Sequence, residues 1–333
     1  MSIIELEPGN FTSLTRTPWA GSMMVDFKKK LVSSCADLIG ESWEFSCDPQ
    51  MPSREKGSQK LIADILKNPC DILVKLLNAN SPLSLQIHPE DSDPSLQDDE
   101  CGKPEAWYIL DAQPNSGIYL GFKDNVSDQE IGQLLRDPQN DTFLHFIPVK
   151  KGDYFEILPG VPHAIGPGVL LLEPQRVRNG KKGKTYRMWD WNRKYDANGK
   201  LDLQNGQGRE LHVSQALACL KGKIAFGPEL EQLCRKKPKT NTFAGGELLE
   251  YPDSDSFALK VFHLNSQVKL RVQIDQISVF TVLNGECTVN GKSYKTTETF
   301  AVESGELEFS GSIKSTISWV TTNAVSGTNY LNI

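Results

Sequence analysis

Four side chains that can bind a metal ion lie on short segments with the pattern of β-strands. Gln86 and His88 stand two positions apart in the run LSLQIHPED, and residues i and i+2 of a strand point to the same face. Glu105 opens the apolar run EAWYIL, and His163 follows the Pro–Gly turn in ILPGVPHAIG. Two imidazoles, one carboxylate and one amide oxygen suit zinc or a similar divalent cation, with room left for water or substrate.

Each of these residues also has a simpler interpretation when it is taken alone. His88 has the pattern of a strand histidine that hydrogen-bonds locally, and Glu105 that of a solvated carboxylate at the start of a strand. A structural role would suit His163 equally well, and Gln86 alone indicates almost nothing. The metal-site hypothesis therefore depends on the four residues occurring together.

The stretch from Arg176 to Lys194 is strongly basic, although the whole chain has a formal net charge of −6. It holds eight basic residues against one acid, Asp190. A solvated loop explains the lysines of GKKGK. Arg187 differs because it lies in an apolar, aromatic strand, where an unpaired charge is costly. We expect Arg187 either to pair with a carboxylate or to face a site.

Together with several longer motifs, the candidate ligands resemble the pattern of the type I phosphomannose isomerases of the cupin superfamily. The run from Gly152 to His163 is similar to the second metal-binding motif of cupin barrels. Other similar segments follow the family's order and cover most of residues 17–220: TPWAG, GESWEFS, GKPEAWYIL, LLLEPQ, TYRMWDWNR and RELHVSQAL. The run QRVRNGKKGKTYR departs from the family, because short bacterial members carry a shorter and less basic segment there.

The resemblance implies an isomerase that interconverts D-mannose 6-phosphate and D-fructose 6-phosphate. It also implies one zinc ion per chain, with the ligands Gln86, His88, Glu105 and His163. Such an isomerisation moves a proton between C1 and C2 through an enediol, so the site needs an acid–base group and a stabiliser of the developing oxyanion.

The resemblance further assigns roles to side chains around the metal. Arg187 matches an arginine taken as essential for catalysis, and Glu173 matches a pocket carboxylate near the reacting carbons. Lys103 matches a lysine that transfers a proton or orients the substrate, and Arg193 is assigned to the phosphate. Whether the metal, Lys103 or Glu173 moves the proton is left open.

Two other functions fit the same residues. One is a cupin-type isomerase or epimerase that acts on another sugar phosphate, which is favoured if the basic run reshapes the pocket. The other is a non-catalytic sugar-phosphate-binding protein. The metal ligands and Arg187 argue against the second, because a pure binder does not need a metal beside a proton-transfer site.

Turn residues divide most of the chain into short apolar runs, which is typical of cupin-type β-barrels or jelly rolls with a few short helices. Helices are expected over residues 58–66 with Ser58 as the cap, over 127–136 and over 214–220. Ser127 and Glu130 have the spacing of a capping box.

The polar run RKKPKTNT marks a change towards an almost wholly strand-like pattern. We expect a catalytic metal-binding domain over residues 1–237 and a cupin-like β-domain over residues 238–333. The second domain is expected to hold no metal, since His263 is its only histidine.

The bulk composition limits the partners and the location of the 333-residue chain. A sequence pI of about 5.5 argues against a broad nucleic-acid-binding surface. The first thirty residues lack the pattern of a signal peptide, and no apolar run is long enough to span a bilayer. Seven cysteines without a C-x-x-C spacing indicate free thiols. We expect a cytoplasmic monomer or weak homodimer that binds a small sugar phosphate and neither nucleic acid nor membrane.

Overall fold

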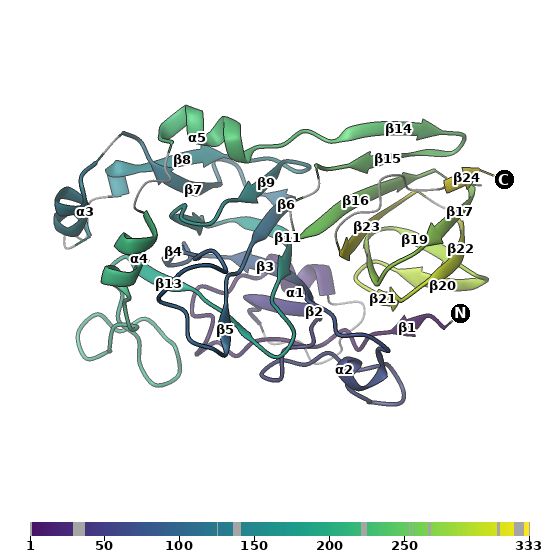
Figure 1. Cartoon of the computed structure of the whole chain (residues 1–333), viewed down its shortest axis with the longest axis horizontal. Helices are drawn as coiled ribbons and strands as arrows, with labels where there is room; N and C mark the ends of the chain where they lie inside the picture. The colour runs from purple at the N-terminus through teal and green to yellow at the C-terminus, as the bar shows by residue number, and fades with distance from the viewer. Residues whose placement is uncertain are drawn as a thin grey trace.

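The computed structural model describes residues 2–28, 37–124, 126–135, 141–220, 225–252, 254, 256–265, 268–311, 314–322 and 330–332. Strands predominate among these residues and the helices are short (Figure 1). The expected mainly β fold is confirmed. Within the described residues the strands form separate sheets and not a closed barrel.

Two five-stranded sheets form the N-terminal sandwich, which is at the left of Figure 1. Sheet 1 has the order β2 (Glu41–Phe45), β3 (Ile72–Ala79), β11 (Val169–Arg176), β6 (Glu105–Ala112) and β9 (Tyr154–Ile157). Sheet 2 has the order β13 (Tyr186–Trp189), β4 (Leu85–Ile87), β10 (His163–Ile165), β7 (Gly117–Phe122) and β8 (Leu144–Pro148). Neighbouring strands in both sheets are antiparallel, whereas β5 (Glu100–Cys101) and β12 (Lys182–Gly183) form a separate parallel pair.

Two further sheets form the C-terminal sandwich. Sheet 3 has seven strands in the order β1 (Ile4–Glu5), β21 (Thr299–Val302), β18 (Ser278–Asn284), β23 (Ser315–Thr322), β16 (Phe257–Leu264), β15 (Gly246–Glu250) and β14 (Lys239–Phe243). Sheet 4 has five strands in the order β20 (Lys292–Lys295), β19 (Glu286–Val289), β22 (Gly305–Ser310), β17 (Lys269–Ile274) and β24 (Tyr330–Asn332).

The four sheets stack as layers. Sheet 1 lies between sheets 2 and 3, so its central strands are buried on both faces. In β3, Val74 and Leu76 belong to an apolar core that also contains Leu259 and Val279 of sheet 3. The alternate residue Leu77 packs instead with residues of sheet 2. A continuous apolar run such as ILVKLLNA therefore suits a strand that separates two cores.

The inward face of sheet 1 changes from apolar to polar along its length. Leu77, Ile109 and Leu171 fill one end of the space between sheets 1 and 2. The same strand faces then carry polar side chains, two or four positions away from these apolar residues. They are Lys75, Glu105, Glu173 and Gln175, and all four are buried. Because side chains alternate along a strand, these polar groups point between the sheets and define the end of the sandwich where chemistry can occur.

Helices cover the outer face of sheet 2 and fill the edges of the sandwich. They are α1 (Met23–Lys28), α2 (Ile62–Ile65), α3 (Asp128–Leu134), α4 (Val213–Leu220) and α5 (Gly227–Cys234), with a 3₁₀ turn at Asp141–Phe143. Ile131 of α3 and Ala216 of α4 share a core with Leu85 and Ile87 of β4. This packing leaves the alternate residues of β4 to face sheet 1.

The expected helices are found with different bounds. The capping box of Ser127 and Glu130 opens α3 and is confirmed. The prediction for residues 58–66 was wrong in extent, because Ser58 lies in a turn and Leu61 is the N-cap of a single-turn helix. Gln59, the residue after Ser58, has a φ of 61°, which a helix does not allow. The last residue predicted for the second helix, residue 136, lies outside the described residues.

The division at residues 237 and 238 stays a prediction. The run between α5 and β14 leads from one sandwich to the other, but β1 near the N-terminus pairs with β21 in sheet 3. Six described cysteines are free thiols, and Cys35 lies outside the described residues. Among the helices of the described part of the chain, none is long and apolar enough to cross a membrane.

Candidate metal centre

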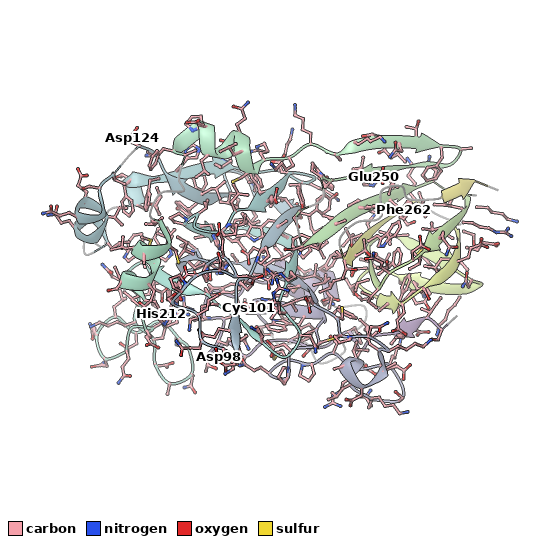
Figure 2. All side chains as sticks on the ribbon, viewed as in Figure 1. Asp98, Cys101, Asp124, His212, Glu250 and Phe262 are labelled. Carbon is pink, nitrogen blue, oxygen red and sulfur yellow. The ribbon has the colours of Figure 1, made fainter. Side chains whose placement is uncertain are left out.

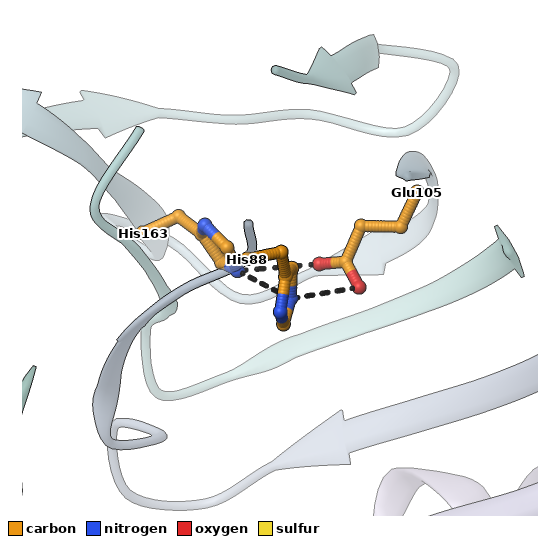
Figure 3. A group of neighbouring side chains, drawn as sticks. All are labelled: His88, Glu105 and His163. Carbon is orange, nitrogen blue, oxygen red and sulfur yellow. Dashed lines mark hydrogen bonds and ion pairs between the residues drawn. The ribbon is translucent and has the colours of Figure 1, made fainter. Parts of the chain in front are cut away.

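His88, Glu105 and His163 converge at the polar end of the N-terminal sandwich (Figure 3). The Nε2 atoms of the two histidines lie 3.2 Å apart. Glu105 Oε2 lies 3.2 Å from His88 Nε2, and Glu105 Oε1 lies 3.3 Å from His163 Nε2. All three side chains are buried, with exposed fractions of 2% or less. Within the described ranges, no other group of three His, Cys, Asp or Glu side chains converges in this way.

Backbone carbonyls hold both imidazole rings in one orientation. His88 Nδ1 lies 3.1 Å from the carbonyl oxygen of Lys184, and His163 Nδ1 lies 2.9 Å from that of Val161. A carbonyl only accepts, so each Nδ1 carries a proton, and in a neutral ring Nε2 then presents a lone pair. Burial, together with the Lys103 ammonium, lowers the pKa of His88 to about 3, so this ring is neutral.

This donor set fits a cation. When both rings are neutral, two Nε2 lone pairs and a carboxylate face one another at about hydrogen-bond distance, which is repulsive unless a positive charge lies among them. Imidazole Nε2 atoms oriented through Nδ1, plus one carboxylate, are a common ligand set for a divalent metal. The residues therefore suit a metal ion by their own chemistry.

Gln86 lies beside the cluster through the register of sheet 2. It is directly opposite His163 in the β10–β4 pair and directly opposite Arg187 in the β13–β4 pair. Residues directly opposite each other in an antiparallel pair point to the same face. Gln86, His163 and Arg187 thus form one row on the face towards sheet 1. The four predicted ligands are brought to one end of the sandwich, and their coordination of a metal stays a prediction.

Glu105 is fixed by neighbours on sheet 1. Gln175, its ladder partner in β11, donates from Nε2 to Glu105 Oε2 at 2.7 Å, and Lys103 Nζ lies 3.3 Å from the same oxygen. Burial alone would raise the pKa of Glu105, but the Lys103 ammonium outweighs it and holds that pKa well below its ordinary value. Burial also opposes the charge on Lys103, yet Glu105 and Glu173 raise its pKa overall. The site keeps Glu105 ionised and Lys103 cationic.

Glu173 lies on the same face, two residues from Gln175. Its Oε1 accepts from Trp107 Nε1 at 3.0 Å, its Oε2 accepts from Gln175 Nε2 at 2.6 Å, and Lys75 Nζ lies 3.6 Å away. Burial, followed by the charge of Glu105, raises the pKa of Glu173 to about 7. Glu173 is thus a carboxyl group poised to take up or release a proton near neutral pH.

Arg187 forms no ion pair with a carboxylate in the described part of the chain. Its Nη1 donates to the carbonyl oxygen of Glu210 at 2.8 Å, and its backbone N–H donates to Nδ1 of His212, which is labelled in Figure 2. The buried Nε has no hydrogen-bond partner among the described residues. Of the two alternatives for this residue, facing a site fits the structure better than pairing with a carboxylate.

Arg193 is held beyond the end of β13 and is paired. Its Nη2 donates to Asp190 Oδ1 at 2.6 Å, and its Nη1 donates to Ser81 Oγ at 3.2 Å. The assignment of Arg193 to a phosphate stays a prediction.

The basic loop that precedes β13 is largely neutralised by acids. Arg176 and Arg178 both pair with Asp91, and Lys182 pairs with Asp99 at 2.8 Å. Lys184 pairs with Glu100. These ion pairs hold the loop against residues 91–100. Most of its positive charge is therefore neutralised and does not form a free cationic surface.

Sequence reasoning gave no role to several residues that hold the site. Gln175 and Trp107 orient the two carboxylates, and Asp190 and Arg209 lie beside the predicted arginines. The signal that could have found Gln175 is its alternation with Glu173 on a buried strand. In the C-terminal sandwich, His263 Nδ1 lies 3.1 Å from Thr316 Oγ1, in keeping with a structural role.

The chain is similar in sequence to several known proteins. No protein-family model matches the chain. Mannose-6-phosphate isomerase ManA of Bacillus subtilis is 31% identical over 218 residues, which are 61% of this chain and 64% of ManA. Mannose-6-phosphate isomerase of Streptococcus mutans is 28% identical over 275 residues, which are 78% of this chain and 80% of that protein.

Solved structures agree on the fold. The crystal structure of the mannose 6-phosphate isomerase from Bacillus subtilis matches with a TM-score of 0.78 and 23% identity, over 96% of this chain and 99% of that one. A mannose 6-phosphate isomerase bound with zinc and yttrium matches with a TM-score of 0.71 and 13% identity, over 97% of this chain and 100% of that one. The resemblance to phosphomannose isomerases that the motifs indicated is confirmed.

Proposed function

We propose that this chain is a mannose-6-phosphate isomerase that interconverts D-mannose 6-phosphate and D-fructose 6-phosphate and uses one zinc ion per chain. The observation that carries the proposal is the convergence of His88, Glu105 and His163 between two sheets of the isomerase fold. The names of the relatives support the substrate, and the zinc-bound neighbour supports the metal. Gln86 completes the proposed ligand set.

The reaction moves a proton between C1 and C2 of the sugar phosphate. A divalent cation bound at this site would supply positive charge that polarises the substrate carbonyl and holds its oxygens. The side chains must then provide an acid–base group and donors for the oxygen that becomes negatively charged.

Glu173 is the side chain best suited to carry the proton. It lies on the same strand face as the Gln175–Glu105 pair, and its raised pKa makes both protonation states accessible near neutral pH. Lys103 points its ammonium at Glu105 from the loop before β6 and can donate to a substrate oxygen. Arg187 shares a face with the proposed ligands and offers an unpaired buried donor.

The direct test is activity on mannose 6-phosphate before and after removal of metal. The proposal predicts that chelation abolishes turnover and that zinc restores it at one equivalent per chain. A protein that holds no metal and does not turn over mannose 6-phosphate would contradict it. A panel of other sugar phosphates in the same coupled assay decides the substrate.

Arg187→Ala separates catalysis from metal binding. We expect full zinc content and loss of most turnover, because the guanidinium lies on the substrate face but is not a ligand. Loss of zinc in this variant would contradict the role given to Arg187. The cytoplasmic location and the monomeric or weakly dimeric state stay predictions.

A further inference from the structure

A buried carboxylate gathers two arginines immediately beyond β13. Asp190 Oδ1 accepts from Arg193 Nη2 and from Arg209 Nη2, each at 2.6 Å, and Asp190 Oδ2 accepts from Arg209 Nε at 2.8 Å. Asp190 is only 3% exposed. Despite this burial, the two guanidinium groups lower the pKa of Asp190, which therefore stays ionised. The pairing fixes both arginines in position.

Arg187 adds a third guanidinium to this group. Its Nη1 donates to the carbonyl of Glu210, the residue after Arg209, so the 209–210 segment lies against it. Burial, followed by the charge of Arg209, lowers the pKa of Arg187. Three guanidinium groups and one buried carboxylate leave a net charge of about +2. This charge complements the charge of about −1.5 to −2 on a phosphate monoester at neutral pH. The Glu210 side chain is 82% exposed and is solvated.

Two donors in this cluster are buried without a partner. Arg187 Nε and the hydroxyl of Tyr195 have no hydrogen-bond partner among the described residues. Tyr195 is only 9% exposed, and the guanidinium carbons of Arg193 and Arg209 lie 5.8 Å and 5.7 Å from the centre of its ring. A buried polar group without a partner is destabilising, and a ligand that accepts the bond would remove that cost.

The cluster also borders open space. Tyr195 and Arg209 line a cavity of about 580 Å³ between the 195–207 loop and Thr15. Arg187 precedes this loop on β13 and stands in the same row as Gln86 and His163 across neighbouring strands. Neighbouring strands are about 4.8 Å apart, so Arg187 lies roughly 5 Å from Gln86 and roughly 10 Å from His163 along this row. A sugar phosphate also carries its phosphate at the end of the carbon chain remote from C1 and C2.

We propose that the Tyr195 hydroxyl, Arg187 Nε and Arg209 receive the phosphoryl group of the substrate, and that Asp190 is a positioning residue that holds Arg193 and Arg209 in place. The inference rests on the proposed function for the identity of the substrate. It adds Tyr195, Arg209 and Asp190 to the binding site and makes Arg193 a supporting member of the cluster.

Tyr195→Phe tests the hydroxyl. Because that hydroxyl has no hydrogen-bond partner among the described residues, its removal should leave the melting temperature of the free protein unchanged or raise it. The KM for mannose 6-phosphate should rise about five- to tenfold, with kcat changed less than twofold and zinc content unchanged. Tyr294→Phe, at a buried tyrosine of the C-terminal sandwich, is the matched control and should leave KM unchanged. An unaltered KM in Tyr195→Phe overturns the inference.

Asp190→Asn tests the positioning role, because the sign of the change in KM distinguishes two roles for Asp190. If Asp190 holds the arginines in place, its neutralisation loosens them and KM rises at least tenfold while kcat falls much less. If Asp190 only offsets positive charge, its neutralisation tightens phosphate binding and KM falls, which overturns the role. Glu231→Gln removes an acid–arginine pair at α5, with Arg235 at 3.1 Å, and should leave KM unchanged.

Inorganic phosphate separates this inference from the proposed function. Calorimetry on the zinc-loaded protein should show phosphate binding that Tyr195→Phe weakens at least fivefold. Phosphate binding with this dependence, in a protein that does not isomerise mannose 6-phosphate, would refute the activity and support the anion site. An active enzyme whose phosphate affinity and KM are unaffected by both substitutions would refute the anion site alone.

Discussion

At the scale of single residues, Gln175 links the predicted metal ligand Glu105 to Glu173, the carboxyl group proposed to carry the proton. Its amide nitrogen donates to Glu105 at 2.7 Å and to Glu173 at 2.6 Å. The side chain is fully buried, so neither bond competes with water. Gln175 thereby holds Glu105 towards the two imidazoles and keeps Glu173 at a fixed distance from it.

Replacing Gln175 with Leu should weaken metal binding without removing a ligand. The substitution keeps the approximate volume and leaves Glu105 without its amide donor. Loss of a group that orients a ligand lowers metal affinity about 10- to 100-fold, which competition with a chromophoric chelator would measure. Gln273→Leu, at an exposed position of β17, should have no effect. Wild-type affinity in Gln175→Leu would contradict the role given to this residue.

Asp190 also makes stability depend on pH. The folded-state pKa is depressed by the two arginines, so the ion pairs stabilise the fold above the unfolded-state pKa of about 3.9. That contribution is lost as the pH falls through the folded-state pKa. The difference in unfolding free energy between the wild type and Asp190→Asn should therefore be largest near pH 7 and shrink below about pH 4. A difference that grows on acidification would contradict this account.

At the scale of elements, strand alternation positions the site. In β4, Leu85 and Ile87 pack outward against helices, and Gln86 is left to face sheet 1. In β11, Leu172 packs towards the C-terminal sandwich, and Glu173 faces inward. A shift of one residue in either strand would exchange these faces and disperse the site.

The same alternation explains how much could be predicted. The candidate ligands His88, Glu105 and His163, which the structure brings together, could be found from the sequence because their residue types bind cations. The role of Gln175 could not be predicted, because it depends on the register between β11 and β6, which lie 70 residues apart at the bond to Glu105. The extent of the helix near Ser58 was wrong because a local turn around Gln59 overrides its apolar spacing.

The capping box of α3 offers a prediction for one element. Ser127 Oγ accepts from the backbone N–H of Glu130, and Glu130 accepts in return from the backbone N–H of Ser127 at 2.8 Å. Ser127→Ala should lower the free energy of unfolding by about 1 kcal/mol, measured by urea denaturation. Isomerase activity should not change, because α3 packs on the outer face of sheet 2. A loss of activity at unchanged stability would contradict this placement.

At the scale of the whole molecule, buried polar groups join the two sandwiches. Lys28 Nζ lies 2.5 Å from Glu44 Oε1, and Thr299 of sheet 3 donates to Glu44 Oε2 at 3.0 Å. Glu44 follows Trp43 in the sequence, and β2 borders the apolar core shared by sheets 1 and 3. The pairing of β1 with β21, about 300 residues away in sequence, adds a backbone connection that local patterns could not predict.

Glu44→Ala should destabilise the whole molecule strongly. It leaves the Lys28 ammonium buried without its partner, and breaking a buried ion pair costs about 3–5 kcal/mol. The exposed pair of Lys56 and Glu298 also joins the two sandwiches, at 3.2 Å, and provides the control. Glu298→Ala should cost less than about 1 kcal/mol in the same denaturation experiment. Equal effects of the two substitutions would contradict the importance of burial at this interface.

Four side chains from three strand segments are proposed to bind one cation: Gln86 and His88 at β4, Glu105 on β6 and His163 on β10. Anomalous diffraction from zinc-loaded crystals, recorded on both sides of the zinc edge, tests this proposal most directly. The account predicts one peak per chain at about 2.0–2.2 Å from His88 Nε2, His163 Nε2, a Glu105 oxygen and Gln86 Oε1. No peak at this position in the presence of zinc, or a peak with a different ligand set, would contradict it.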